Sequence, residues 1–225
     1  MDTSLAACSV AIWRDGAVVA REFIAMPRGQ AEALLPMVER VRGGAGYAWG
    51  DFDRLAVSIG PGSFAGIRVG LAAARGLALA LDLPLAGIGT LELLAAGMTG
   101  SGPVAAVIDA RNSQVYIQHF APDLQALTQP ALLLLDAAIG CCNAYDGLRG
   151  LRLVGGGAPL VARRLSISPA HIDALALPDA AVLAALAAKR HAVPGHDVAP
   201  LYLRPPDAKL PAYAKASAGK PAIVT

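Results

Sequence analysis

The chain has 225 residues, of which 55% are hydrophobic and 16% are charged, and its net charge is +2. This composition excludes a chain that is mainly disordered, and the length is sufficient to bury a core without disulfide or metal support. Residues 1–188 carry 13 Arg against 15 acidic residues, whereas residues 189–225 carry 6 basic residues against 2 acidic ones. A slightly acidic body with a basic tail argues against independent binding of tRNA or DNA.

The three cysteines indicate a reducing compartment. Cys8, Cys141 and Cys142 have no CxxC spacing, which argues against a disulfide framework and a zinc knuckle. The amino end has an acidic residue where a signal peptide has basic ones, and no uninterrupted apolar stretch reaches the roughly 18 residues of a membrane span. We therefore expect a cytoplasmic protein that does not contact the membrane.

The first half of the chain alternates strand and helix patterns. An Asp15-Gly16 turn joins two alternating runs and predicts a hairpin, and Pro36 is expected to kink or divide the helix that follows. The predicted elements are, in order, a hairpin over residues 8–19, a helix over 29–42, a strand over 54–59, a helix over 63–81, a strand over 85–88 and a helix over 90–96.

The second half repeats the layout of the first. Asp2 and Asp109 each stand where a core strand should end and an amphipathic hairpin should begin. The elements predicted here are a strand over residues 104–108, a strand over 115–120, a helix over 132–139, a strand over 151–154 and a helix over 179–193. The repeat predicts an α/β fold of two related subdomains that face each other over a cleft.

The domain boundaries follow from this repeat. We expect the first subdomain over residues 1–102 and the second over 103–178. A helix and an extended segment over 179–211 should pack back on the first subdomain, and the low-complexity tail over 212–225 should be disordered.

The segment Gly60-Pro-Gly-Ser-Phe-Ala-Gly66 is the sharpest local signal. A strand that leads through glycines into a helix can gather backbone amides around a phosphate or carboxylate. The alternative is a tight turn in which Ser63 caps the helix. The loop is not a Walker A motif, since no lysine precedes Lys189, and Pro61 stands where a nucleophile elbow needs glycine.

Small residues form a stripe along the helix that follows the loop. Gly66, Gly70, Ala73 and Leu77 recur at helical spacing. Glycine inside a helix costs about 1 kcal/mol relative to alanine, so we expect that a close packing contact accounts for the glycines in this stripe. It either packs against the sheet or forms a contact surface for a partner helix.

Catalytic and metal signatures are weak. None of the four histidines forms a helical metal-binding pair, and no Ser/His/Asp motif is recognisable. Asp2 and Asp109 could hold a cation opposite a phosphate, or they could cap strand ends. We therefore predict neither a catalytic residue nor a resident metal.

Several motifs resemble the family of tRNA threonylcarbamoyladenosine biosynthesis proteins TsaB, also called YeaZ. They are Asp2-Thr-Ser-Leu-Ala-Ala-Cys-Ser-Val, Glu32-Ala-Leu-Leu-Pro36, Ser58-Ile-Gly-Pro-Gly-Ser-Phe-Ala-Gly-Ile-Arg-Val-Gly70, Ile108-Asp-Ala-Arg111 and Tyr202-Leu-Arg-Pro. Three features depart from the family pattern: Met1 directly precedes Asp2, where the family has several apolar residues that make the central strand; Ala65 replaces a threonine; and Gly155-Gly-Gly157 replaces a common G-D-G.

The resemblance implies an actin-like fold of the sugar kinase and Hsp70 superfamily and a non-catalytic role beside the larger relative TsaD, which transfers threonylcarbamoyl to the adenosine next to the anticodon. It implies pairing with TsaD through the helices over 29–42 and 63–81, with the ATPase TsaE joining the complex, a homodimer when the chain is alone, and tRNA contact only through the complex. The implied interface residues are Leu34, Leu35, Val38, Val41, Gly66, Gly70, Ala73 and Leu77.

The resemblance implies no required cofactor, with ATP or ADP bound only within the complex. The phosphate or nucleotide candidates are Asp2, Thr3, Ser4, Gly60, Gly62, Ser63, Arg68, Asp109, Gly155, Gly156 and Gly157. Two other functions stay open. One is an ATP-dependent phosphotransferase that uses Asp2, Asp109 and the three glycines, and the other is a peptidase that uses Ser63.

Overall fold

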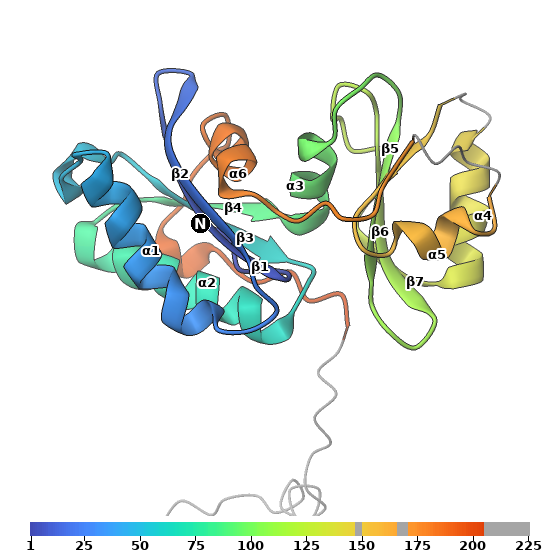
Figure 1. Ribbon diagram of the computed structural model, residues 1–225, viewed down its shortest axis with the longest axis horizontal. Helices are drawn as coiled ribbons and strands as arrows, with labels where there is room; N and C mark the ends of the chain where they lie inside the picture. The colour runs from blue at the N-terminus through green and yellow to red at the C-terminus, as the bar shows by residue number, and fades with distance from the viewer. Residues whose placement is uncertain (147–149, 166–170, 205–225) are drawn as a thin grey trace, which may run out of the picture.

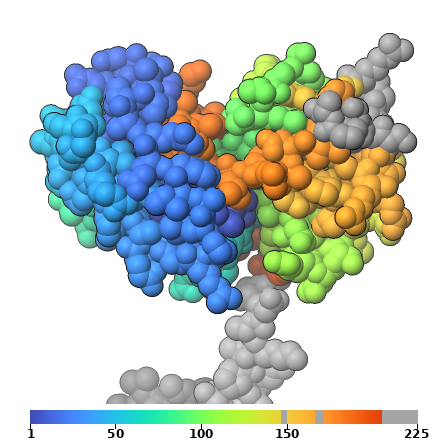
Figure 2. All heavy atoms as spheres, viewed as in Figure 1, coloured from blue at the N-terminus to red at the C-terminus, as the bar shows by residue number. Residues whose placement is uncertain are grey.

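The computed structural model describes residues 1–146, 150–165 and 171–204. The tail expected at 212–225, and the end of the extended segment before it, lie outside these residues. The chain forms two lobes, joined by a narrower waist in the space-filling view (Figure 2). The segment between β9 and α6 crosses from one lobe to the other (Figure 1).

The N-terminal lobe contains the predicted hairpin and a strand–helix–strand unit. Its elements are β1 (Ala7–Arg14), β2 (Ala17–Ala25), α1 (Gln30–Gly44), the 3-10 helix η1 (Trp49–Asp51), β3 (Leu55–Gly60), α2 (Phe64–Leu81), β4 (Leu85–Gly89) and α3 (Thr90–Gly97). Strands β1 and β2 pair antiparallel from Ala7↔Ala25 to Arg14↔Ala17, and β3 pairs parallel with β4. Of the two outcomes expected at Pro36, a division of the helix does not occur, since α1 is one helix from Gln30 to Gly44.

The C-terminal lobe is built on a five-stranded sheet in the order β7-β6-β5-β8-β9. Its elements are β5 (Val104–Asp109), β6 (Gln114–Phe120), β7 (Ala131–Leu134), α4 (Leu135–Asp146), β8 (Arg152–Val154), α5 (Ala158–Ala162) and β9 (Ile172–Asp173). The chain then returns to the first lobe through α6 (Ala180–Ala187) and the 3-10 helix η3 (Gly195–Asp197).

The helix predicted over 132–139 is partly wrong. Residues 131–134 form strand β7, which pairs antiparallel with β6, and the helix begins only at Leu135. The run Leu132–Leu135 has no strand periodicity of its own, and pairing with the free edge of β6 determines its conformation.

Helices cover both faces of the strands in the N-terminal lobe. Cys8, Val10 and Ile12 of β1 face α1, in one core with Leu34 and Met37. The intervening Ser9 faces the other way, and its hydroxyl accepts a hydrogen bond of 2.9 Å from the amide of Ala180 at the start of α6. This alternation follows from the two-residue period of a strand, and it places α1 and α6 on opposite faces (Figure 1).

Strand β5 is the centre of the second lobe. Ala105 and Val107 face a core shared with α4 and α5. The alternate residues Val104, Ala106 and Ile108 face α3. Helix α3 also contacts α6 and β3, so it lies between the two lobes (Figure 1). The predicted two-lobed α/β architecture is confirmed.

A buried histidine makes the stability of the second lobe depend on pH. His119 is 2% exposed, its ring stacks on Tyr145 with centroids 4.5 Å apart, and Cys142 Sγ lies 3.6 Å from its Nε2. Burial lowers the pKa of His119 from 6.5 to about 4. Between these values the unfolded chain binds the additional proton, so stability rises with pH over this window and falls as the medium is acidified.

We predict that lowering the pH from 7 to 4.5 costs the chain about 2 kcal/mol through His119. His119→Phe keeps an aromatic ring against Tyr145 but cannot titrate, so it should lack this part of the loss. Urea unfolding of both proteins at the two pH values measures the difference. Equal losses in the two proteins would show that His119 does not cause the pH dependence.

Candidate functional site

The glycine-rich loop after β3 packs tightly against the amino-terminal segment Asp2–Ser4. The Ser63 amide donates to the Ser4 carbonyl over 2.8 Å, and Thr3 Oγ1 donates to the Gly66 carbonyl over 2.7 Å. A Cβ atom on Gly62 would lie 2.3 Å from the Ser4 oxygen, and one on Gly66 would lie 2.0 Å from the Thr3 oxygen. Glycine is therefore required at both positions because two backbones approach each other.

These contacts weigh against the expectation that Gly60, Gly62 and Ser63 form an anion site. The Ser63 hydroxyl caps α2 by accepting from the Gly66 amide over 3.2 Å, and the Ser63 amide is bonded to Ser4. Two donors of the loop, the amides of Ser63 and Gly66, are thus used within the lobe, which favours the tight-turn alternative. Thr3 and Ser4, also predicted to face a ligand, are fully buried in the same contact.

Asp2 is a buried residue that bonds to its neighbours. Its Oδ1 accepts from the Ser4 hydroxyl over 2.6 Å and from the Ser4 amide over 3.2 Å. Burial raises the pKa of Asp2, although hydrogen bonds with Ser4 and Ser58 oppose this shift. Burial also lowers the pKa of the Met1 amino group to about 6. A carboxyl group enclosed in this way does not face a cation in solvent, so Asp2 acts as a strand-end cap.

The second lobe repeats this packing at the end of β5. A Cβ atom on Gly155 would lie 2.5 Å from the Val107 oxygen, and one on Gly157 would lie 2.9 Å from the Asp109 amide nitrogen. Gly156 is exposed, with open space around its Cα. Asp109 accepts from the Arg111 amide over 2.8 Å, so it caps its strand end as Asp2 does. The hydrogen bonds of Asp2 to Ser4 and of Asp109 to Arg111 lie within their own lobes.

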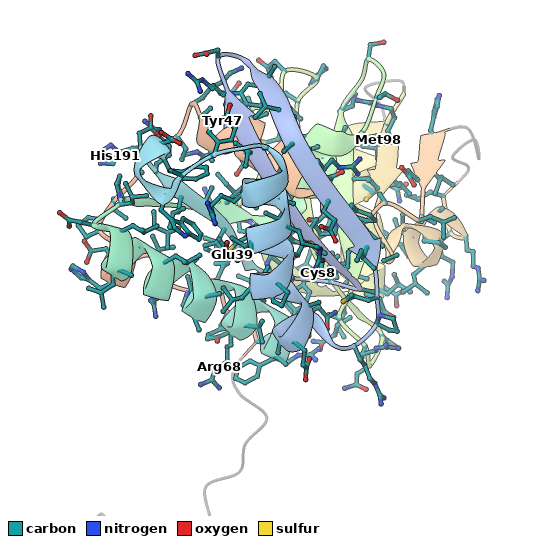
Figure 3. All side chains as sticks on the ribbon, turned by 60° about the vertical axis from the view of Figure 1, so that its left-hand side comes forward. Cys8, Glu39, Tyr47, Arg68, Met98 and His191 are labelled. Atoms are coloured by element: carbon teal, nitrogen blue, oxygen red, sulfur yellow. The ribbon has the colours of Figure 1, made fainter. Side chains whose placement is uncertain are left out.

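Arg68 lies on α2, two residues after the end of the first glycine loop. It is exposed, its guanidinium lies 5.0 Å from the centre of the Phe64 ring, and it points away from the lobe (Figure 3). Together with residues of the extended segment it lines a groove of about 910 Å³ between the lobes. The aromatic contact in this groove, Phe64 with Tyr202 at 5.4 Å, joins α2 to the extended segment, which the sequence predicted to pack back on the first subdomain.

Most of the predicted interface residues face inward, which corrects their assignment. Leu34, Val38 and Val41 belong to the core beneath α1, and a Cβ atom on Gly70 would lie 2.6 Å from Thr3 Oγ1. Gly66 is buried in the same way, and Ala73 and Leu77 are half-buried against this core. The glycine stripe thus lets α2 approach its own lobe. Of the eight residues, Leu35 is the one that is plainly exposed, at 49%.

The outer side of α2 carries a second stripe that sequence reasoning missed. Ala72, Gly76 and Leu79 are exposed and recur at i, i+4 and i+7, and Leu79 is 86% exposed. By length and composition alone α2 could cross a membrane, but its inner side lies in the core of the lobe. The periodicity was visible in the sequence, but which of the two stripes faces outward depends on the contact with Thr3.

Within the described residues no group of three or more His, Cys, Asp or Glu side chains is placed to hold a metal ion. The histidine and cysteine pair of the second lobe, His119 and Cys142, is enclosed in its core.

Comparisons with known proteins agree with this architecture. The sequence model of a family described as TsaD, tRNA N6-adenosine threonylcarbamoyltransferase, matches residues 25–198. The tRNA threonylcarbamoyladenosine biosynthesis protein TsaB of Escherichia coli K12 is 42% identical over 126 residues, which cover 55% of this chain and 54% of the relative. TsaB of Bacillus subtilis 168 is 32% identical over 117 residues, or 52% of this chain and 51% of the relative.

The chain thus spans about half the length of the curated relatives that it matches. The solved structure of YeaZ from Pseudomonas aeruginosa matches with a TM-score of 0.77 and 32% identity, covering 90% of this chain and 97% of that one. The two lobes with repeated strand-end glycine contacts therefore define an actin-like α/β protein. The chain belongs to the TsaD family, in the branch of the TsaB (YeaZ) proteins.

Two glycines of α2 test the packing of the loop. We predict that Gly66→Ala destabilises the chain by about 3 kcal/mol or more, because its Cβ collides with the Thr3 carbonyl. Gly76→Ala is the matched control. No atom lies within 4 Å of its Cβ position, and it should stabilise the chain by up to about 1 kcal/mol. Urea unfolding measures both, and equal effects would contradict the close approach.

Proposed function

We propose that this chain is a non-catalytic subunit in the formation of N6-threonylcarbamoyladenosine in tRNA, and that it acts by docking onto a catalytic relative of the TsaD type. The curated relatives that it resembles are TsaB proteins of tRNA threonylcarbamoyladenosine biosynthesis. The proposal includes the ATPase TsaE as a further partner, a cytoplasmic location, and ATP or ADP bound only within the complex.

The observation that carries the proposal is the exposed apolar face of α2. Ala72, Gly76 and Leu79 leave an apolar stripe in solvent, and Leu35 of α1 is exposed as well. Burying one leucine side chain is worth about 1.5–3 kcal/mol, and small residues let a second helix come close. Asp2, Thr3 and Ser4, by contrast, are buried, and the Ser63 hydroxyl caps α2.

The charge of residues 1–188 supports a role in which the chain does not bind tRNA by itself. Residues 1–188 have more acidic than basic residues, so the chain lacks the basic body that phosphate contacts require. We therefore place tRNA contact in the complex. In the absence of the catalytic relative, the same apolar face closes against a second copy and forms a homodimer.

We predict that Leu79→Glu weakens binding to the TsaD-type relative at least about tenfold, because a charge would be desolvated in an apolar contact. The matched control is Leu175→Glu, since Leu175 is 90% exposed in the other lobe, against 86% for Leu79. Both variants should fold as the parent does. Calorimetric titration of the purified relative measures the affinities.

Normal binding by Leu79→Glu, or an equal loss of affinity in both variants, would show that the outer side of α2 is not the interface. Binding by neither the parent nor the variants would contradict the proposal as a whole.

The two other functions receive less support from the structure. A phosphotransferase that uses Asp2 would need this buried carboxyl to face its ligand, and the Ser63 hydroxyl of the proposed peptidase is engaged as a helix cap. We expect no saturable heat of binding when Mg-ATP is titrated into the isolated chain. Saturable binding would favour the phosphotransferase.

A further inference from the structure

The extended segment over residues 198–204, which we call the strap, runs beside α2 and reaches the second lobe. The Leu201 amide donates to the Ile59 carbonyl of β3 over 2.8 Å, and Arg204 Nη2 donates to Gln114 Oε1 of β6 over 2.7 Å. The strap is therefore fixed to both lobes. The groove of about 910 Å³ lies between the strap and α2, which together supply most of its walls.

The charge of this groove differs from that of the lobes around it. Among the described residues that line the groove, none is aspartate or glutamate and three are arginines: Arg68 and Arg75 of α2 and Arg204 of the strap. Residues 1–188, by contrast, carry more acidic than basic residues. A cleft lined by one sign of charge concentrates the electric field, so the groove favours an anionic ligand.

The arginines keep hydrogen-bonding capacity for such a ligand. Arg75 Nη2 donates to the Val198 carbonyl over 2.6 Å, but its Nε is enclosed and has no hydrogen-bond partner among the described residues. In the same part of the chain, none of the three arginines forms an ion pair with a carboxylate. A guanidinium has five N–H donors, so a carboxylate can bind without breaking the bonds already formed.

The walls between the charges are apolar. Ile67 and Leu71 of α2 line the groove, and so do the rings of Phe64 and Tyr202, which are about half exposed and have centroids 5.4 Å apart. A ligand that covers these rings removes apolar surface from water, which is favourable. The ligand that fits the groove therefore combines anionic groups with apolar surface, as an acidic peptide with apolar side chains does.

The spacing of the charges favours an extended peptide over a nucleotide. Arg68 and Arg75 are seven residues apart on α2, which is about 10.5 Å along the helix axis. Residues three apart in an extended chain are separated by about 10 Å. The phosphates of one nucleotide share bridging oxygens and lie closer together than this. A nucleic acid would bring a charge with every nucleotide toward the acidic lobes, which repel it.

We infer that this groove binds an extended acidic segment of a partner protein, in which two carboxylates three residues apart pair with Arg68 and Arg75. Apolar side chains of the segment cover the rings of Phe64 and Tyr202. The segment thus supplies the negative charge that the lining residues lack, and it buries the apolar wall.

The groove is continuous with the exposed stripe of α2. Arg68, Ala72, Arg75 and Leu79 recur at i, i+4, i+7 and i+11, so they share one side of the helix. A partner helix that packs on Ala72 and Leu79 brings its flanking segment to the groove. The acidic segment therefore belongs to the TsaD-type relative, and this assignment rests on the proposed function.

A fluorescent peptide, Leu-Glu-Val-Leu-Glu-Leu, tests the groove of the full chain without the relative. The matched peptide has glutamine in place of both glutamates. We expect the acidic peptide to bind at least about tenfold more tightly, because the amides cannot form charge-assisted pairs with the arginines. Arg68→Gln/Arg75→Gln should abolish this preference. Arg163→Gln/Arg164→Gln removes the same charge from an exposed site in the second lobe and should keep it.

Two further measurements separate charge from structure and groove from partner. Arg68→Gln alone leaves the bond from Arg75 to the strap intact, and it should weaken binding of the acidic peptide about threefold or more. In calorimetric titration of the TsaD-type relative, Arg68→Gln/Arg75→Gln should bind about tenfold more weakly than the Arg163→Gln/Arg164→Gln control.

Equal binding of the two peptides, binding of neither, or an equal loss of affinity in the two double variants would overturn the inference. Displacement of the peptide by ADP or by oligouridylate at equal or lower concentration would assign the groove to a nucleotide or to RNA instead. Equal binding of the relative by both double variants would contradict the assignment of the segment to the relative. If the acidic peptide binds as expected but the relative does not bind the parent chain, the groove stands and the proposed function fails.

Discussion

The contact on which the first lobe depends is the approach of two backbones, Asp2–Ser4 and the loop that opens α2. Side chains at Gly62 or Gly66 would place a carbon within 2.3 Å of a carbonyl oxygen, so the contact exists only because both are glycine. The loop also starts α2, and the contact therefore determines where this helix lies on the core. The second lobe uses the same arrangement, with Gly155 and Gly157 against β5.

This contact also determines which surfaces of the lobe are available to bind a ligand or another protein. It engages the Ser63 amide and hydroxyl in bonds within the lobe, and it encloses Asp2. It turns the glycine stripe of α2 inward, which leaves the opposite stripe, with Leu79, in solvent. A two-lobed fold with its polar groups used internally and an apolar helix face exposed is suited to association with another protein.

Local signals in the sequence predicted much of the fold. The Asp15-Gly16 turn predicted the β1–β2 hairpin, Ser63 predicted the start of α2, and the spacing of the two aspartates predicted the repeat. What depended on distant contacts was not predictable. Strand β7 exists because it pairs with β6, and the inward side of α2 is decided by Thr3, some 60 residues away in the chain. The sequence therefore indicated where the backbone is unusual, but not that the Ser63 amide and hydroxyl bond within the lobe.

The most direct test of this account is side-chain footprinting with hydroxyl radicals, on the chain alone and mixed with its TsaD-type relative. Leu79 and Leu175 are both almost fully exposed in the chain alone and should react strongly. The account predicts that complex formation protects Leu79 and leaves Leu175 reactive. A complex in which Leu79 stays as reactive as before would contradict it.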